Sequence, residues 1–216
     1  MTDELELLKK DWQNKEFNVP KLSYEDIHKM IWKKSSSIVK WILIISILEF
    51  SVPHLLYLFP SMREGMEVYE KIGVSQYLFG LSVFIYTVAL YFIFQFYKRF
   101  KEISVLDNSK NLMRKIIKTR KTVKHYVIFS LSMIMVTIII MIIGVYLNDN
   151  IALAFPEFKE GLANVSQEKL KITIMLAIGI FGVVLTLFMG GVYFLLYGLL
   201  LRKLKKNYTE LRQLEI

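Results

Sequence analysis

The stretch that decides the fold of this chain runs from Ile134 to Ile143 and reads IMVTIIIMII. It contains one hydroxyl group and no charge, so a helix built from it has apolar side chains on every side. A helix at the surface of a soluble protein keeps a polar face toward water. This stretch therefore indicates a helix surrounded by lipid, and it lies inside a longer apolar run without any ionisable residue other than tyrosine.

Three further apolar runs are also long enough to cross a hydrocarbon core of roughly 30 Å, which takes about 20 residues of helix. The four runs contain 23, 22, 22 and 29 residues, and they are Ile38–Pro60, Gln76–Tyr97, Tyr126–Leu147 and Thr173–Leu201. They predict an all-α fold, a four-helix transmembrane bundle in one membrane domain over residues 38–201, with the lipid bilayer as its solvent. No segment between or beside them is long enough for an ordinary independent domain.

Lysine and arginine alternate across the spans. The segments 1–37, 98–125 and 202–216 contain 22 of the 28 basic residues, and the other two loops contain 5. Because basic residues in short loops stay in the cytoplasm, both termini and the loop 98–125 are predicted to be cytoplasmic, in the inner membrane of a bacterium. The net charge of +9 then follows from the orientation, and we expect no nucleic-acid partner.

The segment 1–37 is predicted to form cytoplasmic amphipathic helices. Leu5, Leu8 and Trp12 recur at helical spacing, and Pro20 interrupts that helix. Ser23 then begins a second helix, with its hydroxyl positioned to accept from the amide three residues later. Two interpretations stay open for this segment: a helix lying on the inner leaflet, or a docking helix for a cytoplasmic protein.

The loop 98–125 is predicted to form a basic helical hairpin that continues the second and third spans into the cytoplasm. Its apolar residues recur near helical spacing, and Arg114, Lys118 and Lys121 occupy the gaps between them. The segment Asp107–Ser109 is expected to cap the second helix of the hairpin. The basic tail 202–216 continues the fourth span in the same way, and these elements are the expected surface for a cytoplasmic partner.

Glu49 is the sharpest candidate for a functional residue. It is the twelfth of 23 residues in the first run, and an acidic side chain near the membrane midplane costs roughly 2.5–3.5 kcal/mol to insert. We expect it to form one hydrogen-bonded layer with polar residues near the centres of the other runs, which are Tyr86, Thr87, Thr137 and Thr186. Three interpretations remain: a structural pin between helices, a proton or substrate relay in a small transporter or channel, and a side chain that happens to face lipid.

Small residues line one face of the fourth run, since Gly182, Thr186 and Gly190 follow one another at intervals of four. Such a stripe permits close approach of a second helix. The partner is either another span of the same bundle or the same span of a second copy in a homodimer.

No motif for enzymatic chemistry is present in the sequence. Cysteine is absent, and there is no nucleophile elbow, no phosphate-binding glycine loop and no pair of histidines at metal-ligand spacing. The sequence therefore predicts a protein that is not an enzyme, with no metal and no cofactor. A membrane scaffold or regulator is the favoured function, and a proton-coupled carrier at Glu49 is the alternative.

Two segments near the N-terminus resemble a known family. They are Glu6–Trp12, which reads ELLKKDW, and Ile31–Glu49, which includes KKSSSIVKW at residues 33–41. Both are similar to segments of uncharacterised bacterial four-span membrane proteins that often carry an automatic label of carotene oxygenase. That label implies an iron held by a set of histidines. The chain departs from it, because its three histidines lie on three segments and on both sides of the predicted membrane: His28, His54 and His125.

Overall fold

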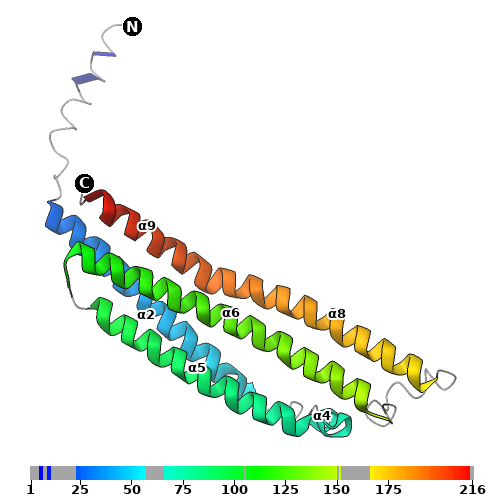
Figure 1. Cartoon of the computed structure of the whole chain (residues 1–216). Helices are drawn as coiled ribbons and strands as arrows, with labels where there is room; N and C mark the ends of the chain where they lie inside the picture. Colours follow the sequence, from blue (N-terminus) through cyan, green and yellow to red (C-terminus); the bar gives the residue numbers. More distant parts are fainter. Residues whose placement is uncertain are drawn as a thin grey trace.

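The computed structural model describes residues 5–6, 9–10, 23–56, 66–104, 106–149, 151 and 166–214. Within these residues the regular structure is entirely helical, with no strand. The described helices, in chain order, are α2 (Tyr24–Leu56), α4 (Met66–Ile72), α5 (Ser75–Ser104), α6 (Ser109–Leu147), α8 (Gln167–Tyr193), the π-helix η2 (Phe194–Gly198) and α9 (Leu199–Leu214). The helices α8, η2 and α9 follow one another without a break and form one long rod (Figure 1).

Four rods run side by side and antiparallel (Figure 1). Each is long and apolar enough to cross a membrane, so the chain is a multi-pass membrane protein and the predicted all-α bundle is confirmed. The helix α2 packs against α5 and α9, and α6 packs against α5, α8 and α9. The last residues of the first predicted span, 57–60, lie outside the described part of the chain.

The helices are much longer than a bilayer requires. With a rise of 1.5 Å per residue, the 39 residues of α6 measure about 59 Å, against a hydrocarbon core of roughly 30 Å. The excess lies mainly at one end, where the start of α2, the turn between α5 and α6 and the end of α9 come together (Figure 1). Residues 24–37, 98–104, 106–125 and 202–214 form this end, which we call the basic end.

Polar caps fix where three of the helices begin. The Ser23 hydroxyl accepts from the Asp26 amide at 3.1 Å, as the sequence predicts. The Asn108 side chain accepts from the Asn111 amide at 2.9 Å and begins α6 within the predicted capping segment. Ser166 caps α8 in the same manner. These caps satisfy amides at the helix starts that have no partner inside the helix.

The buried side chains form two clusters, one toward each end of the bundle. The larger cluster fills the basic end and continues to the level of Tyr126, and it includes Ile103, Leu112, Ile116 and Leu204 at 0–1% exposure. The smaller cluster joins α4, α6 and α8 at the opposite end. Between them, large apolar residues such as Phe181 and Leu187 point outward, as expected for surfaces that contact lipid.

Candidate functional site

The carboxylate of Glu49 lies at the junction of α2 with the rod formed by α8 and η2. Its two oxygens accept hydrogen bonds from two different tyrosines, one from Tyr193 and one from Tyr197 at 3.0 Å. Both tyrosines are buried, with exposed fractions of 5% and 1%. A buried polar group needs such partners, and each oxygen of Glu49 has one.

A short π-helix follows Tyr193 and contains Tyr197. Tyr193 is the last residue of α8, and Tyr197 lies in η2, whose bounds are Phe194 and Gly198. A π-helical turn contains about one residue more than an α-helical turn, so it changes the direction of the side chains that follow. Single π-turns inside α-helices are rare and are often found at functional sites. Here the irregular turn begins directly after Tyr193 and contains Tyr197, and these are the two residues that bind Glu49.

A third tyrosine completes an aromatic wall around the acid. The ring centroid of Tyr126 on α6 lies 6.3 Å from that of Tyr193 and 5.8 Å from that of Tyr197. Both contacts are edge-on, which is a favourable geometry for aromatic pairs. Tyr126 also interacts electrostatically with Glu49. The site therefore joins α2, α6, α8 and η2 through one carboxylate and three rings.

A cavity of about 320 Å³ adjoins this cluster between all four rods. Most of its lining is apolar, and Glu49 is the only charged residue among the described residues that line it. Hydroxyl-bearing residues that line it include Ser130, Thr137 and Tyr126. Pockets of about 300 Å³ and more, with apolar walls and a few convergent polar groups, are typical of small-molecule sites. Chemically, this one suits a proton, or a small apolar molecule that carries a positive charge or a hydrogen-bond donor.

Tyr197, which binds Glu49, and Ser130, which lines the same cavity, each lie near basic residues of their own helix. Tyr197 is five residues from Arg202 along the rod, and Ser130 is six residues from Lys124 along α6. These separations correspond to about 8–9 Å. The depth of Glu49 in the membrane remains a prediction.

The structure brings together part of the predicted layer of polar residues, since Tyr86 and Thr137 line the same cavity as Glu49. The hydroxyls of Thr87, Thr137 and Thr186 donate to carbonyls of their own helices, at 2.8–2.9 Å, rather than to Glu49. This is the usual behaviour of threonine in a helix, because its hydroxyl reaches the carbonyl four residues earlier. Tyr86 lines the cavity and packs its ring 4.8 Å from that of His54.

Sequence reasoning missed the tyrosines because Tyr193 and Tyr197 lie near the predicted end of the fourth span. There tyrosine is common at membrane boundaries, and neither residue stands out. Their spacing of four residues was the one available signal, since it places both rings on one side of a helix.

The small-residue stripe of α8 faces α6 at one of its two glycines. A side chain at Gly182 would approach Ile138 to 2.6 Å, so this glycine permits the two helices to lie close together. The Thr186 hydroxyl lies 3.3 Å from the sulfur of Met135, also on α6. Gly190, in contrast, has open space around it. The contacts within the bundle account for Gly182 and Thr186, and the homodimer remains a prediction.

The predicted docking residues are placed as follows. Arg114, Lys118 and Lys121 are exposed on α6 at the basic end, and Leu5 is exposed as well. Leu8 and Trp12 lie outside the described residues.

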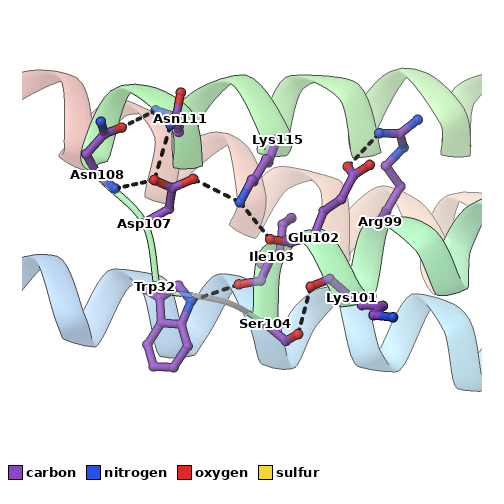
Figure 2. A network of polar contacts seen from close by, with 10 residues as sticks. All are labelled: Trp32, Arg99, Lys101, Glu102, Ile103, Ser104, Asp107, Asn108, Asn111 and Lys115. Carbon is purple, nitrogen blue, oxygen red and sulfur yellow. Dashed lines mark hydrogen bonds and ion pairs between the residues drawn. The ribbon is translucent and has the colours of Figure 1, made fainter.

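A polar network holds the basic end together (Figure 2). The indole nitrogen of Trp32 donates to the Ile103 carbonyl at 2.8 Å, which joins α2 to the end of α5. The ammonium of Lys115 on α6 donates to the Glu102 carbonyl at 2.7 Å and pairs with Asp107 at 3.0 Å. The three helices are thus tied to the turn between α5 and α6.

Asp107 is the centre of this network. Its carboxylate accepts from the Asn111 side chain at 3.1 Å and from the Asn108 amide at 2.8 Å (Figure 2). These hydrogen bonds, first that from Asn111 and then that from Lys115, hold the pKa of Asp107 below its usual value of 3.8. The carboxylate is therefore charged under ordinary conditions and acts as an acceptor for the whole turn.

Across the described residues, no group of three or more histidines, aspartates or glutamates is arranged to hold a metal ion. The ring of His54 contacts the Phe50 carbonyl at 2.8 Å, and the ring of His28 stacks near Tyr24. These contacts belong to different parts of α2.

The chain belongs to the family described as a domain of unknown function, DUF8845, which matches residues 25–216. The match begins after the segment Glu6–Trp12 that carries part of the sequence resemblance, and it includes all four spans. The family's description assigns no activity, and no oxygenase appears in it. No curated protein and no solved structure matches the chain.

Proposed function

We propose that this member of the DUF8845 family is a non-catalytic scaffold or regulator of the bacterial inner membrane, with its basic end in the cytoplasm. In this proposal the basic end is a ready-made binding surface for a cytoplasmic protein. The observation that carries the proposal is the buried core of that end, which continues all four spans beyond the length that a bilayer needs.

A packed core matters because it fixes the binding surface before a partner arrives. Ile103, Leu112 and Ile116 have 0–1% of their surface exposed, and the Trp32 indole bonds across to α5. Side chains and helices that are already ordered lose less entropy on binding. Four separate amphipathic helices would instead have to become ordered when the partner binds.

The exposed charges supply the second part of the argument. Arg114, Lys118 and Lys121 project from α6, and their neighbours on the inner face of the helix are buried. A basic rim around a rigid body favours a partner with an acidic surface and raises the rate of encounter. The segment 1–22 joins the bundle at the Ser23 cap and adds Leu5, Leu8 and Trp12 as candidate docking residues.

The orientation is tested by single-cysteine labelling, for which the cysteine-free chain is suited. Lys118→Cys lies at the basic end, and Glu168→Cys lies at the opposite end; both positions are exposed. In intact cells, a membrane-impermeant maleimide is expected to label Glu168→Cys and to leave Lys118→Cys unlabelled until the membrane is opened. The reverse pattern contradicts the proposal.

The partner role is tested by crosslinking in cells, followed by purification and mass spectrometry. A chain that lacks residues 1–22 and a chain with Arg114, Lys118 and Lys121 changed to glutamine are each compared with the full chain. A charge-matched control changes three exposed basic residues elsewhere at the basic end, Lys101, Lys205 and Arg212. Loss of the same specific protein in the first two variants and its retention in the control are expected. An unchanged set of partners in both variants contradicts the docking role.

The cavity beside Glu49 supports a second candidate, a proton-coupled carrier. Glu49 is partly buried and bonded to two tyrosines, and the adjoining volume of about 320 Å³ has room for a small ligand. An acidic residue inside a membrane protein suggests a proton or substrate pathway by default. The test is proton uptake into proteoliposomes under an imposed potential, measured for the wild type and for Glu49→Gln. Uptake that Glu49→Gln abolishes supports the carrier; absence of uptake, or uptake that ignores the change, rules it out.

A further inference from the structure

A groove of about 640 Å³ lies between α2 and α9 at the basic end. Lys33 and Lys34 form one wall, and Lys203 and Lys206 form the other. Ile38 contributes apolar surface beside the four ammonium groups. The groove therefore combines concentrated positive charge with an apolar flank.

The walls of the groove are held in fixed positions. Beneath it, the side-chain amide of Asn207 donates to the Ser35 hydroxyl at 2.9 Å, and both residues are buried. Val39 on α2 and Leu204 on α9 are fully buried on the inner side of the same contact. Because the two helices are packed through this seam, the backbone positions from which the four lysines project are fixed without a ligand.

The depth of the groove along the bundle indicates which surroundings it meets. Ile38 is the first residue of the first apolar run, and Lys203 lies two residues beyond the end of the fourth run at Leu201. The groove is thus at the level where hydrocarbon gives way to lipid headgroups. One turn further into the membrane, Trp41 is 55% exposed, in the position where tryptophan marks the interface.

The charges in the groove are poorly balanced. The one acidic residue among the described residues of its lining, Glu210, pairs with Lys206 at a long distance of 3.8 Å, and the Lys206 side chain is largely accessible. Four lysines against one glutamate leave a surplus of three positive charges on the lining. The complementary ligand is therefore an anion with at least one full negative charge. The rest of the ligand molecule is apolar, because it must lie along Ile38 and Trp41.

We propose that the groove between α2 and α9 is a binding site for an anionic phospholipid of the leaflet at the basic end. The phosphate and any further acidic group of the head would lie among Lys33, Lys34 and Lys203, and an acyl chain would run past Ile38 toward Trp41. Basic pockets between transmembrane helices at the headgroup level are the usual place for such lipids. The site is separate from the proposed partner surface on α6.

The test uses the full-length protein in a neutral detergent and native mass spectrometry with added phosphatidylglycerol or phosphatidylcholine. The groove variant Lys33→Gln/Lys203→Gln removes one charge from each wall. The matched control Lys118→Gln/Lys121→Gln removes two exposed charges from α6 at the same end. We expect the wild type and the control to bind phosphatidylglycerol at least tenfold more tightly than phosphatidylcholine, and the groove variant to lose most of that preference.

Two results would overturn the proposal. One is an equal loss of phosphatidylglycerol binding in the groove variant and the control, since it would show that net charge alone attracts the lipid. The other is full competition by glycerol phosphate at concentrations equal to those of the lipid, since it would assign the groove to a soluble phosphate compound. All variants keep the buried seam of Ser35 and Asn207, and their helix content is checked by circular dichroism, so that loss of binding reports on the groove.

Discussion

Replacing Ile116 with alanine tests whether the basic end is a packed bundle. Ile116 is 0% exposed within the larger core, whereas its neighbour Ile117 is 49% exposed on the same helix. The sequence pattern alone gives both residues the same apolar character. A fully buried isoleucine changed to alanine costs about 2–5 kcal/mol of unfolding free energy, because apolar burial is lost and a void is left.

Ile117→Ala is the internal control. Half of the Ile117 side chain already lies in contact with solvent, and alanine is a better helix former than isoleucine. We therefore expect the unfolding free energy to fall by about 1 kcal/mol or less. For a chain of this length, 1 kcal/mol corresponds to roughly 2–4 °C in Tm. Ile116→Ala should therefore lower the Tm by about 4–20 °C, and Ile117→Ala by no more than about 4 °C.

The assay is thermal unfolding of the purified protein in one detergent, followed by intrinsic fluorescence and by loss of the monodisperse peak. Both variants are compared at the same protein and detergent concentration. Equal shifts for Ile116→Ala and Ile117→Ala would refute the reasoning, because they would mean that the two faces of α6 have the same surroundings and that no core exists at this end.

Three further predictions concern other parts of the bundle. Gly182→Ala should destabilise the protein by about 1–3 kcal/mol in the same thermal assay, because the new methyl group meets Ile138. Gly190→Ala, whose methyl group enters open space, should be neutral or stabilising. The opposite order of stability would contradict the close packing of α6 and α8. Tyr197→Phe should lower the unfolding free energy by about 0.5–3 kcal/mol, since it removes one of the hydrogen bonds to Glu49. The same change in a Glu49→Gln background should lower it by less. Additive losses would show that the two groups do not interact. Asp107→Asn should destabilise the protein near neutral pH. The difference in unfolding free energy from the wild type should shrink as the pH falls below 3.8, because the hydrogen bond from Asn111 lowers the pKa of the Asp107 carboxyl in the folded protein. A difference in unfolding free energy that is constant down to pH 2 would contradict this prediction.

The elements that could be predicted are those set by local sequence. The four spans follow from runs of apolar residues, and the starts of α2 and α6 follow from Ser23 and from the capping segment around Asn108. In each case the physical cause acts within a few residues: lipid excludes charge from a helix, and a side-chain oxygen satisfies a free amide. Reading one sequence is sufficient for such features.

The partners of Glu49 could not be predicted because they depend on the register between distant helices. Tyr193 and Tyr197 lie more than 140 residues away, and the second of them lies in the π-helical turn of η2. A pairing by depth within each run led instead to Thr87, Thr137 and Thr186. Depth counted from the ends of a run is a poor guide here, because the helices continue well beyond the membrane and their packing, rather than the bilayer, fixes their relative height.

The basic end shows the same division between local pattern and packing. Its amphipathic repeats predict helices with one apolar face, and those faces are the ones that become buried. The sequence left open whether they would turn toward lipid, toward a partner or toward one another. The structure shows that these faces pack against one another, through contacts such as the hydrogen bonds from Trp32 to Ile103 and from Asn207 to Ser35. Residue spacing does not reveal either contact.

The most direct test of the account is hydrogen–deuterium exchange of the full-length protein in lipid nanodiscs. The account predicts that backbone amides in residues 109–125 and 202–211 stay protected about as long as those in the membrane-spanning residues 126–147, because all of them belong to one packed bundle. Rapid exchange of the first two segments, while 126–147 stays protected, would contradict the claim that the spans continue as a folded body beyond the membrane.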